Sequence, residues 1–173
     1  MQILDNKKVY SGRVFSLYKT HLKDNEGLKI FRETVVHPGA VAIIPLISKN
    51  KIILVRQYRY AAGQHIWELP AGTLNPNESP LVCAKRELEE ETGFVAGRIK
   101  MITHFYTCPG FCTEKMHLFI AEKLQATAQK LDPDEKITYK IFNRSEIRHL
   151  AAKNKINDAK SLIGLILWLQ RKI

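Results

Sequence analysis

The sequence lacks any apolar run that could cross a membrane as a helix, which takes about 20 residues. Its longest candidate, residues 161–170, is shorter, and the leucines and isoleucines there are spaced like the buried side of a helix. The first residues, MQILDNKKVYSGR, lack the basic start and apolar middle of a signal peptide. These absences argue against a membrane or secreted protein, and we expect a cytoplasmic one.

Cysteine is scarce as well. The three thiols, Cys83, Cys108 and Cys112, are an odd number without a CxxC pair, so a disulfide framework is not expected. His104 and His117 flank two of these cysteines and raise a zinc site as an alternative. The spacing matches no structural zinc pattern, and a Pro-Gly pair interrupts the segment, so we favour reduced thiols.

The charge balance is basic, at +10 from 27 Lys and Arg against 17 Asp and Glu. The basic residues are spread from Lys7 to Lys172, without the dense or aromatic-interleaved stripe of a nucleic-acid-binding protein. We therefore expect no nucleic-acid partner. A solvated surface is one interpretation, and a field that attracts anionic, phosphate-bearing small molecules is the one we favour.

A length of 173 residues fits one globular domain with a small appendage. Hydrophobic periodicity and turn residues define the expected elements. Asp24 to Gly27 form a polar turn, Ser145 and Asp158 are candidate helix caps, and Gly93 is positioned to end a helix. We predict strands over residues 9–22, 28–37, 40–47, 51–58, 67–69, 98–106, 116–124 and 137–142, and helices over 78–92, 146–153 and 159–171. This order favours an α/β fold, an α/β/α sandwich with a mixed sheet.

The helix over residues 78–92 carries an acidic face. At 100° per residue, Glu87, Glu90 and Glu91 share an arc of about 100°, whereas Glu89 falls on the other side. Three like charges on adjacent turns repel, so a fold alone does not need them. Hard divalent cations such as Mg²⁺ or Mn²⁺ do need such oxygens. The alternative is an acidic face in solvent.

The residues around this helix decide between the two. From Gly72 to Phe94 the chain reads G-x5-E-x7-R-E-L-x-E-E-x-G-F. This matches the whole Nudix box, G-x5-E-x7-R-E-U-x-E-E-x-G-U with U apolar, and chance would give the fixed identities on the order of once in 10⁹ start positions. The chain thus resembles the Nudix hydrolases, which implies their α/β/α sandwich and the hydrolysis of a diphosphate linked to another group.

The resemblance also implies roles for individual residues. Glu87 and Glu91 are the expected ligands of Mg²⁺, for which Mn²⁺ is a possible substitute, and Glu90 is expected to bind a further ion or its water. The main-chain carbonyl of Ala71 is expected to join them, and Arg86 to orient the glutamates.

Flanking segments resemble one branch of the family, the ADP-ribose pyrophosphatases. These segments are FRETV, VRQYR, WELPAG and PGFCTE, within residues 28–142, and Pro109 lies sixteen residues after Gly93, as is usual in that branch. The resemblance implies hydrolysis of ADP-ribose to AMP and ribose 5-phosphate. GDP-mannose, another nucleotide sugar or a dinucleotide is the alternative substrate, and a non-catalytic nucleotide-sensing protein is a more distant alternative.

The same resemblance suggests the residues that bind substrate. Arg56 and Arg59 are expected to contact phosphate or ribose oxygens, and Phe31 to stack on the base. Glu114 is a candidate for contact with the terminal ribose or the metals, and Glu135 for positioning or deprotonating water. The competing interpretations are an ordinary strand surface for the arginines, a core position for Phe31 and a merely hydrophilic loop for Glu135.

The first residues complete the expected architecture. By resemblance, residues 1–38 form a small N-terminal antiparallel β-sheet subdomain and residues 39–173 the Nudix hydrolase domain. Relatives of this branch are homodimers in which N-terminal strands of one subunit help to build the other subunit's site. We therefore expect a homodimer, in which Phe31 would serve the partner's site.

Overall fold

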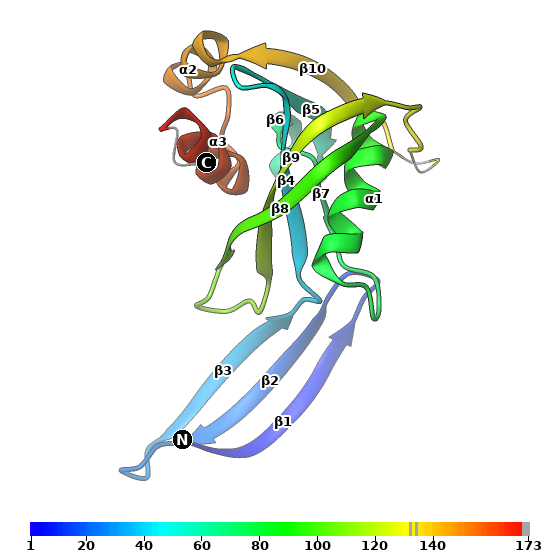
Figure 1. The fold of residues 1–173 in the computed structure, drawn as a ribbon. Helices are drawn as coiled ribbons and strands as arrows, with labels where there is room; N and C mark the ends of the chain where they lie inside the picture. Colours follow the sequence, from blue (N-terminus) through cyan, green and yellow to red (C-terminus); the bar gives the residue numbers. More distant parts are fainter. Residues whose placement is uncertain (132, 134, 171–173) are drawn as a thin grey trace.

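The structure of the chain, a computed structural model, describes residues 1–131, 133 and 135–170. Its strands form two separate sheets. A three-stranded sheet made by the first part of the chain projects from a larger, helix-covered sheet (Figure 1). The α/β class with a mixed sheet and an additional small antiparallel sheet is therefore confirmed.

The small sheet is antiparallel, with the strand order β1-β2-β3. Its strands are β1 (Gln2–Ser11), β2 (Ser16–Lys23) and β3 (Lys29–Val36). The predicted single strand over residues 9–22 is wrong, because the chain turns at residues 12–15, where the backbone N–H of Gly12 donates to the carbonyl of Phe15. The turn at residues 24–27 is confirmed: the Asp24 carboxylate accepts from the backbone N–H groups of Glu26 and Leu28.

The larger sheet has seven strands. Its main path runs β10-β5-β4-β9-β8, with β6 paired to β5 and β7 paired to β4. The pairing of β4 with β9 is parallel and the others are antiparallel, so the sheet is mixed. The strands are β4 (Ala40–Ser48), β5 (Lys51–Arg59), β6 (Gln64–Glu68), β7 (Ala71–Thr73), β8 (Phe94–Tyr106), β9 (Lys115–Ala126) and β10 (Thr138–Asn143). The short strand predicted over residues 67–69 overlaps the end of β6, which begins three residues earlier, and β7 was not predicted.

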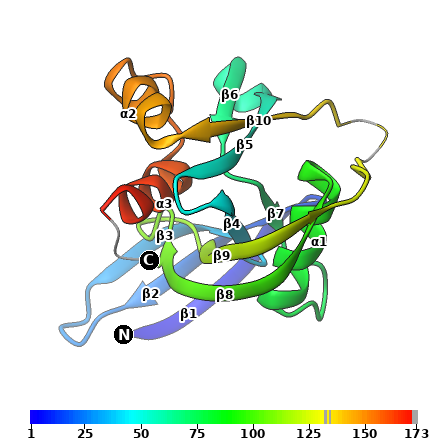
Figure 2. The same cartoon turned by 45° about the horizontal axis from the view of Figure 1, so that its top comes forward.

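Three α-helices cover the sheet, and a 3₁₀ turn (Tyr60–Ala62) follows β5. The α-helices are α1 (Pro80–Thr92), α2 (Arg144–Ala152) and α3 (Ala159–Leu169). Helix α1 lies on one side of the larger sheet, and α2 and α3 lie on the other, as Figures 1 and 2 show. Among the described residues, no helix is both long and apolar enough to span a membrane.

Strand β4 joins the two halves of the core because both of its faces are buried, as its nearly continuous apolar sequence predicts. Ala42 and Ile44 belong to the cluster that includes Leu165 and Trp168 of α3. Val41 and Ile43 alternate with them and belong to the cluster on the α1 side, which is completed by Cys83, Ala84, Leu88, Phe119 and Ala121. The alternation of a strand thus fixes on which side each helix packs.

The helix ends follow local capping rules with one correction. Asp158 caps α3, as predicted, by accepting from the backbone N–H of Ser161. Ser145 does not cap α2; that residue is Asn143, which forms a capping box with Glu146. Asn143 is favoured because its side chain and that of Glu146, three residues later, satisfy each other's backbone N–H groups, so the helix starts one residue before Ser145.

Helix α3 packs closely on the sheet at Gly164. A Cβ added there would lie 2.5 Å from Cδ1 of buried Leu69 and 3.4 Å from Cδ1 of Ile44. We predict that Gly164→Val lowers the free energy of unfolding by about 1–3 kcal/mol through overpacking, measured by urea denaturation. Ile166→Val on the exposed side of α3 is the control, and equal stability of the two variants would contradict this packing.

Candidate active site

Helix α1 holds the acidic residues at the edge of the core. Ser79 caps its first turn by accepting from the backbone N–H of Val82, and Pro80 occupies the first helical position. Gly93 ends it in the left-handed conformation, with φ of 70°. The apolar face of α1 packs against β4 and β9, so the carboxylates next to that face are drawn inside with it.

The glutamates of α1 differ in burial as their positions around the helix predict. Glu91 is 3% exposed and Glu87 is 9% exposed, whereas Glu90 is half-buried. Glu89 lies apart from them and pairs with Lys130, with Nζ 2.7 Å from Oε1. The structure therefore brings Glu87, Glu90 and Glu91 to one face.

Arg86 organises three carboxylates at once. Its Nη1 donates to Glu87 at 2.6 Å and to Glu90 at 2.9 Å. Its Nε and Nη2 donate to the two carboxylate oxygens of Glu78, both at 2.9 Å. The hydrogen bonds from Arg86 lower the pKa of Glu78 to about 2, with further help from the backbone N–H of Asn75. Glu78 thus anchors Arg86 in the position from which it reaches the other two carboxylates.

The pKa values of Glu91 and Glu87 are raised, in contrast to that of Glu78. Burial, and then the charge of Glu87, raises the pKa of Glu91 well above its usual value, although the backbone N–H of Ala71 donates to its Oε2 at 3.0 Å. Burial also raises the pKa of Glu87 against the effect of Arg86. The charge of Glu135 raises the pKa of both glutamates, so Glu135 lies near this face.

The residues fit a divalent cation on two observations. A Cβ added at Gly72 would lie 1.9 Å from Oε1 of Glu87, so only a glycine leaves room for this carboxylate against the backbone. The second is that two buried carboxylates lie next to one another, an arrangement that a bound cation stabilises. Within the described residues, no three His, Cys, Asp or Glu side chains are already arranged to hold an ion, and Arg86 donates hydrogen bonds to both Glu87 and Glu90.

Arg59 is near this face but makes a strong contact that the sequence did not predict. Its Nε and Nη2 donate to the carboxylate of Glu68 at 2.7 and 2.9 Å. The charge of Glu91 also helps to raise the pKa of Arg59, after burial, which lowers it, and Glu68, which raises it. Lys160 of α3 pairs with Glu68 as well, at 2.5 Å. No local signal indicates this contact, because Lys160 lies 92 residues further along the chain.

The remaining candidates lie elsewhere. Arg56 is exposed, 5.9 Å from the ring of Trp67, and Phe31 contacts His21 and Lys19 within the small sheet. Glu114 accepts a hydrogen bond from Thr107 at 2.6 Å. None of these contacts joins Phe31, Arg56 or Glu114 to the glutamates of α1.

The segment around Glu114 joins the two sheets. The backbone of Val35 in β3 exchanges hydrogen bonds with Phe111 and Thr113, at 2.8 and 2.9 Å. The thiols are free, as expected, and the described residues give the zinc alternative at Cys108 and Cys112 no metal-binding group.

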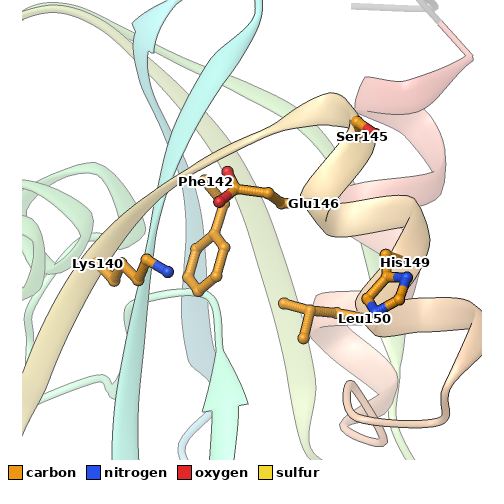
Figure 3. Close-up of a pocket in the computed structure, with 6 residues that line it drawn as sticks. All are labelled: Lys140, Phe142, Ser145, Glu146, His149 and Leu150. Carbon is orange, nitrogen blue, oxygen red and sulfur yellow. The ribbon is translucent and has the colours of Figure 1, made fainter.

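A separate hollow of about 350 Å³ lies between β10 and α2. Figure 3 shows the ring of Phe142 between Lys140 and the side chains of α2. It is lined by Lys140, Phe142, Ser145, Glu146, His149 and Leu150, none of which is a predicted site residue. We therefore place the candidate active site at α1 and the strands beside it.

A mixed sheet between helices, with a glutamate-bearing helix next to Gly72 of β7, is the fold and site of a pyrophosphohydrolase. The model of the NUDIX domain matches residues 36–163, and the chain belongs to the Nudix hydrolase family. Enzymes of this family generally use divalent metal ions.

Curated relatives match nearly the whole chain. It is 39% identical to an ADP-ribose pyrophosphatase of Bacillus subtilis (strain 168), over 96% of this chain and 90% of that protein. It is 37% identical to a methanol dehydrogenase activator of Bacillus methanolicus, over 94% of this chain and 89% of that protein. It is 32% identical to a GDP-mannose pyrophosphatase of Shigella flexneri, over 94% of this chain and 92% of that protein.

A solved structure supports the same assignment. The crystal structure of an ADP compounds hydrolase matches with a TM-score of 0.86 and 25% identity, over 99% of this chain and 95% of that one. The small sheet is therefore included in the matched region, together with the larger one.

The raised pKa values generate a prediction about stability. A carboxyl group whose pKa is higher in the folded state than its usual 4.5 stabilises the fold while protonated, and that stability is lost as the pH rises through the folded-state pKa. We expect the metal-free protein to lose stability as the pH rises from about 4.5 to the folded-state pKa. The variant Glu91→Gln keeps an acceptor for the N–H of Ala71 but carries no charge. Its stability should therefore fall less with rising pH than that of the wild type.

Urea unfolding in EDTA between about pH 5 and 8 measures this difference. Glu89→Gln is the matched control, because it removes a carboxylate from the same helix outside the buried pair. Parallel pH profiles of the wild type and Glu91→Gln would show that the charge of Glu91 does not destabilise the fold.

Proposed function

We propose that this chain hydrolyses the diphosphate bond of ADP-ribose, giving AMP and ribose 5-phosphate, with Mg²⁺ as its cofactor and Mn²⁺ as a substitute. The observation that carries the proposal is a pair of buried carboxylates. Glu87 lies against the backbone at Gly72, and Glu91 accepts a hydrogen bond from the backbone N–H of Ala71. The names of the Bacillus subtilis relative and of the solved ADP compounds hydrolase support the nucleotide.

In this proposal Glu87, Glu91 and the carbonyl of Ala71 hold the cation, and Glu90 holds a further ion or its water. When bound, a divalent cation neutralises charge on the phosphate oxygens and lowers the pKa of a water molecule. Arg86 keeps Glu87 and Glu90 in position, which supports the orienting role expected from the sequence.

Four further residues act on the substrate or on the attacking water in this proposal. Arg59, whose positive charge acts to lower the pKa of Glu91, binds a phosphate oxygen. Glu135, whose charge acts on both buried glutamates, takes a proton from the attacking water. Arg56 and Glu114 contact phosphate and ribose at the outer side of the site.

We also propose that the chain is a homodimer and that Phe31 stacks on the base in the partner's site. All ten residues of β1 are exposed, and so are large apolar side chains of the small sheet, including Ile3, Tyr10 and Phe31. Such a surface favours contact with another protein chain. The domain boundary after residue 38, the cytoplasmic location and the lack of a nucleic-acid partner stay predictions.

GDP-mannose is the second candidate substrate, since a GDP-mannose pyrophosphatase is also a relative over most of the chain. We expect ADP-ribose to give the highest kcat/KM in a panel of nucleoside diphosphate sugars and dinucleotides, with AMP and ribose 5-phosphate identified by chromatography. EDTA should abolish turnover and Mg²⁺ should restore it. A higher kcat/KM for GDP-mannose would reverse the choice, and binding without turnover would indicate a nucleotide sensor.

The dimer and the role of Phe31 are tested together. Light scattering should give about twice the chain mass of 19.9 kDa. Phe31→Ala should raise KM about 5- to 10-fold with the dimer intact, because it removes one stacking contact. Leu28→Ala truncates another exposed apolar side chain of the same sheet and is the control. A monomeric wild type, or equal KM values for the two variants, would refute the proposed role.

A further inference from the structure

The carboxylate of Glu68 is a buried charge that lies outside the motif from Gly72 to Phe94. Glu68 is 1% exposed and lies at the end of β6, three residues before Ala71. Two cations share it: Arg59 donates to both oxygens, and Lys160 pairs with Oε2 at 2.5 Å. Burial alone would raise its pKa, but the hydrogen bond from Arg59 and the charge of Lys160 lower it, so the carboxylate is ionised.

The first turn of α3 holds Lys160 in this place. Asp158, the cap of α3, pairs with Lys160 at 3.0 Å through Oδ1 and accepts from Ser161 through Oδ2. The hydroxyl of Ser161 accepts in turn from the backbone N–H of Leu69 at 2.7 Å. Helix α3 is thus joined to the segment that leads into Ala71 by the ion pair of Lys160 with Glu68 and by the hydrogen bond between Ser161 and Leu69.

The two cations around Glu68 differ in their freedom to move. The side chain of Arg59 is 41% exposed, whereas that of Lys160 is 11% exposed and held by Asp158. If Arg59 were the sole partner of Glu68, turning it toward a substrate would leave a buried carboxylate without a cation, which is strongly unfavourable. With Lys160 in place, Glu68 keeps a cation when Arg59 leaves.

We propose that Lys160 is a positioning residue that holds Glu68, so that Arg59 can exchange this carboxylate for a phosphate oxygen of the substrate. The inference rests on the proposed function, in which Arg59 binds a diphosphate. Lys160 itself acts through Glu68 and does not touch the substrate. Substrate binding then requires only a local turn of one exposed arginine.

The experiment compares KM and kcat for the best substrate of the panel. Lys160→Met should leave Glu68 dependent on Arg59, so we expect KM to rise about tenfold with kcat within about twofold. Lys160→Arg keeps a cation and should stay close to the wild type. Lys153→Met removes an exposed lysine next to α2 and controls for the change in net charge.

A rescue separates this role from a merely structural one. Adding Glu68→Gln to Lys160→Met removes the carboxylate that traps Arg59, so KM should return to within about twofold of the wild-type value. Glu68→Gln alone should not raise KM, which keeps the test decisive even if Lys160→Met fails to fold. A structural role predicts that the second substitution adds to the defect.

The outcomes are distinct. An unchanged KM in Lys160→Met, a loss confined to kcat, or a double variant worse than the single one would overturn the role of Lys160 while the wild type still hydrolyses its substrate. A wild type that hydrolyses no compound of the panel would instead overturn the proposed function.

Discussion

Two like charges buried side by side are the constraint on which this structure depends. Glu87 and Glu91 would be more stable in water, yet the apolar face of α1 packs on β4 and β9 and takes them inside with it. Arg86, the N–H of Ala71 and the space left by Gly72 are arranged around these carboxylates. The site therefore stores an unfavourable charge arrangement that a bound cation relieves.

The same helix shows how environment, rather than residue type, sets the state of a carboxylate. Glu78 has its pKa lowered to about 2 because both of its oxygens accept from Arg86. Glu91 has its pKa raised because it is buried next to Glu87. One glutamate thus serves as a permanent anion that fixes an arginine, and the other keeps its proton to a higher pH than a carboxyl group in water does.

A third buried carboxylate, that of Glu68, connects distant parts of the chain near the candidate site. Glu68 joins Arg59 of β5 to Lys160 of α3, and the adjacent Leu69 is bound by Ser161. The small sheet is connected in a different way, through backbone hydrogen bonds between Val35 and the loop before β9. Helix α3 therefore contributes charge beside the candidate site, whereas the small sheet exposes apolar side chains such as Ile3 and Phe31.

The sequence by itself determined most of the elements and the acidic face of helix α1, because their causes are local. Periodicity, caps and turns predicted α1, α3 and most strands, and helix geometry grouped Glu87, Glu90 and Glu91 on one face and separated Glu89 from them. The hairpin at residues 12–15 and the cap at Asn143 were missed, although their signals are also local.

Only the tertiary structure decided what lies around that helix. It brought Glu135 close to Glu87 and Glu91, gave Arg59 a carboxylate partner, and placed Lys160 beside Glu68 from 92 residues away. Contacts of this kind depend on how β5, β6 and α3 pack together. Since the energy of a charge depends on its burial and its neighbours, no local pattern in the sequence could reveal them.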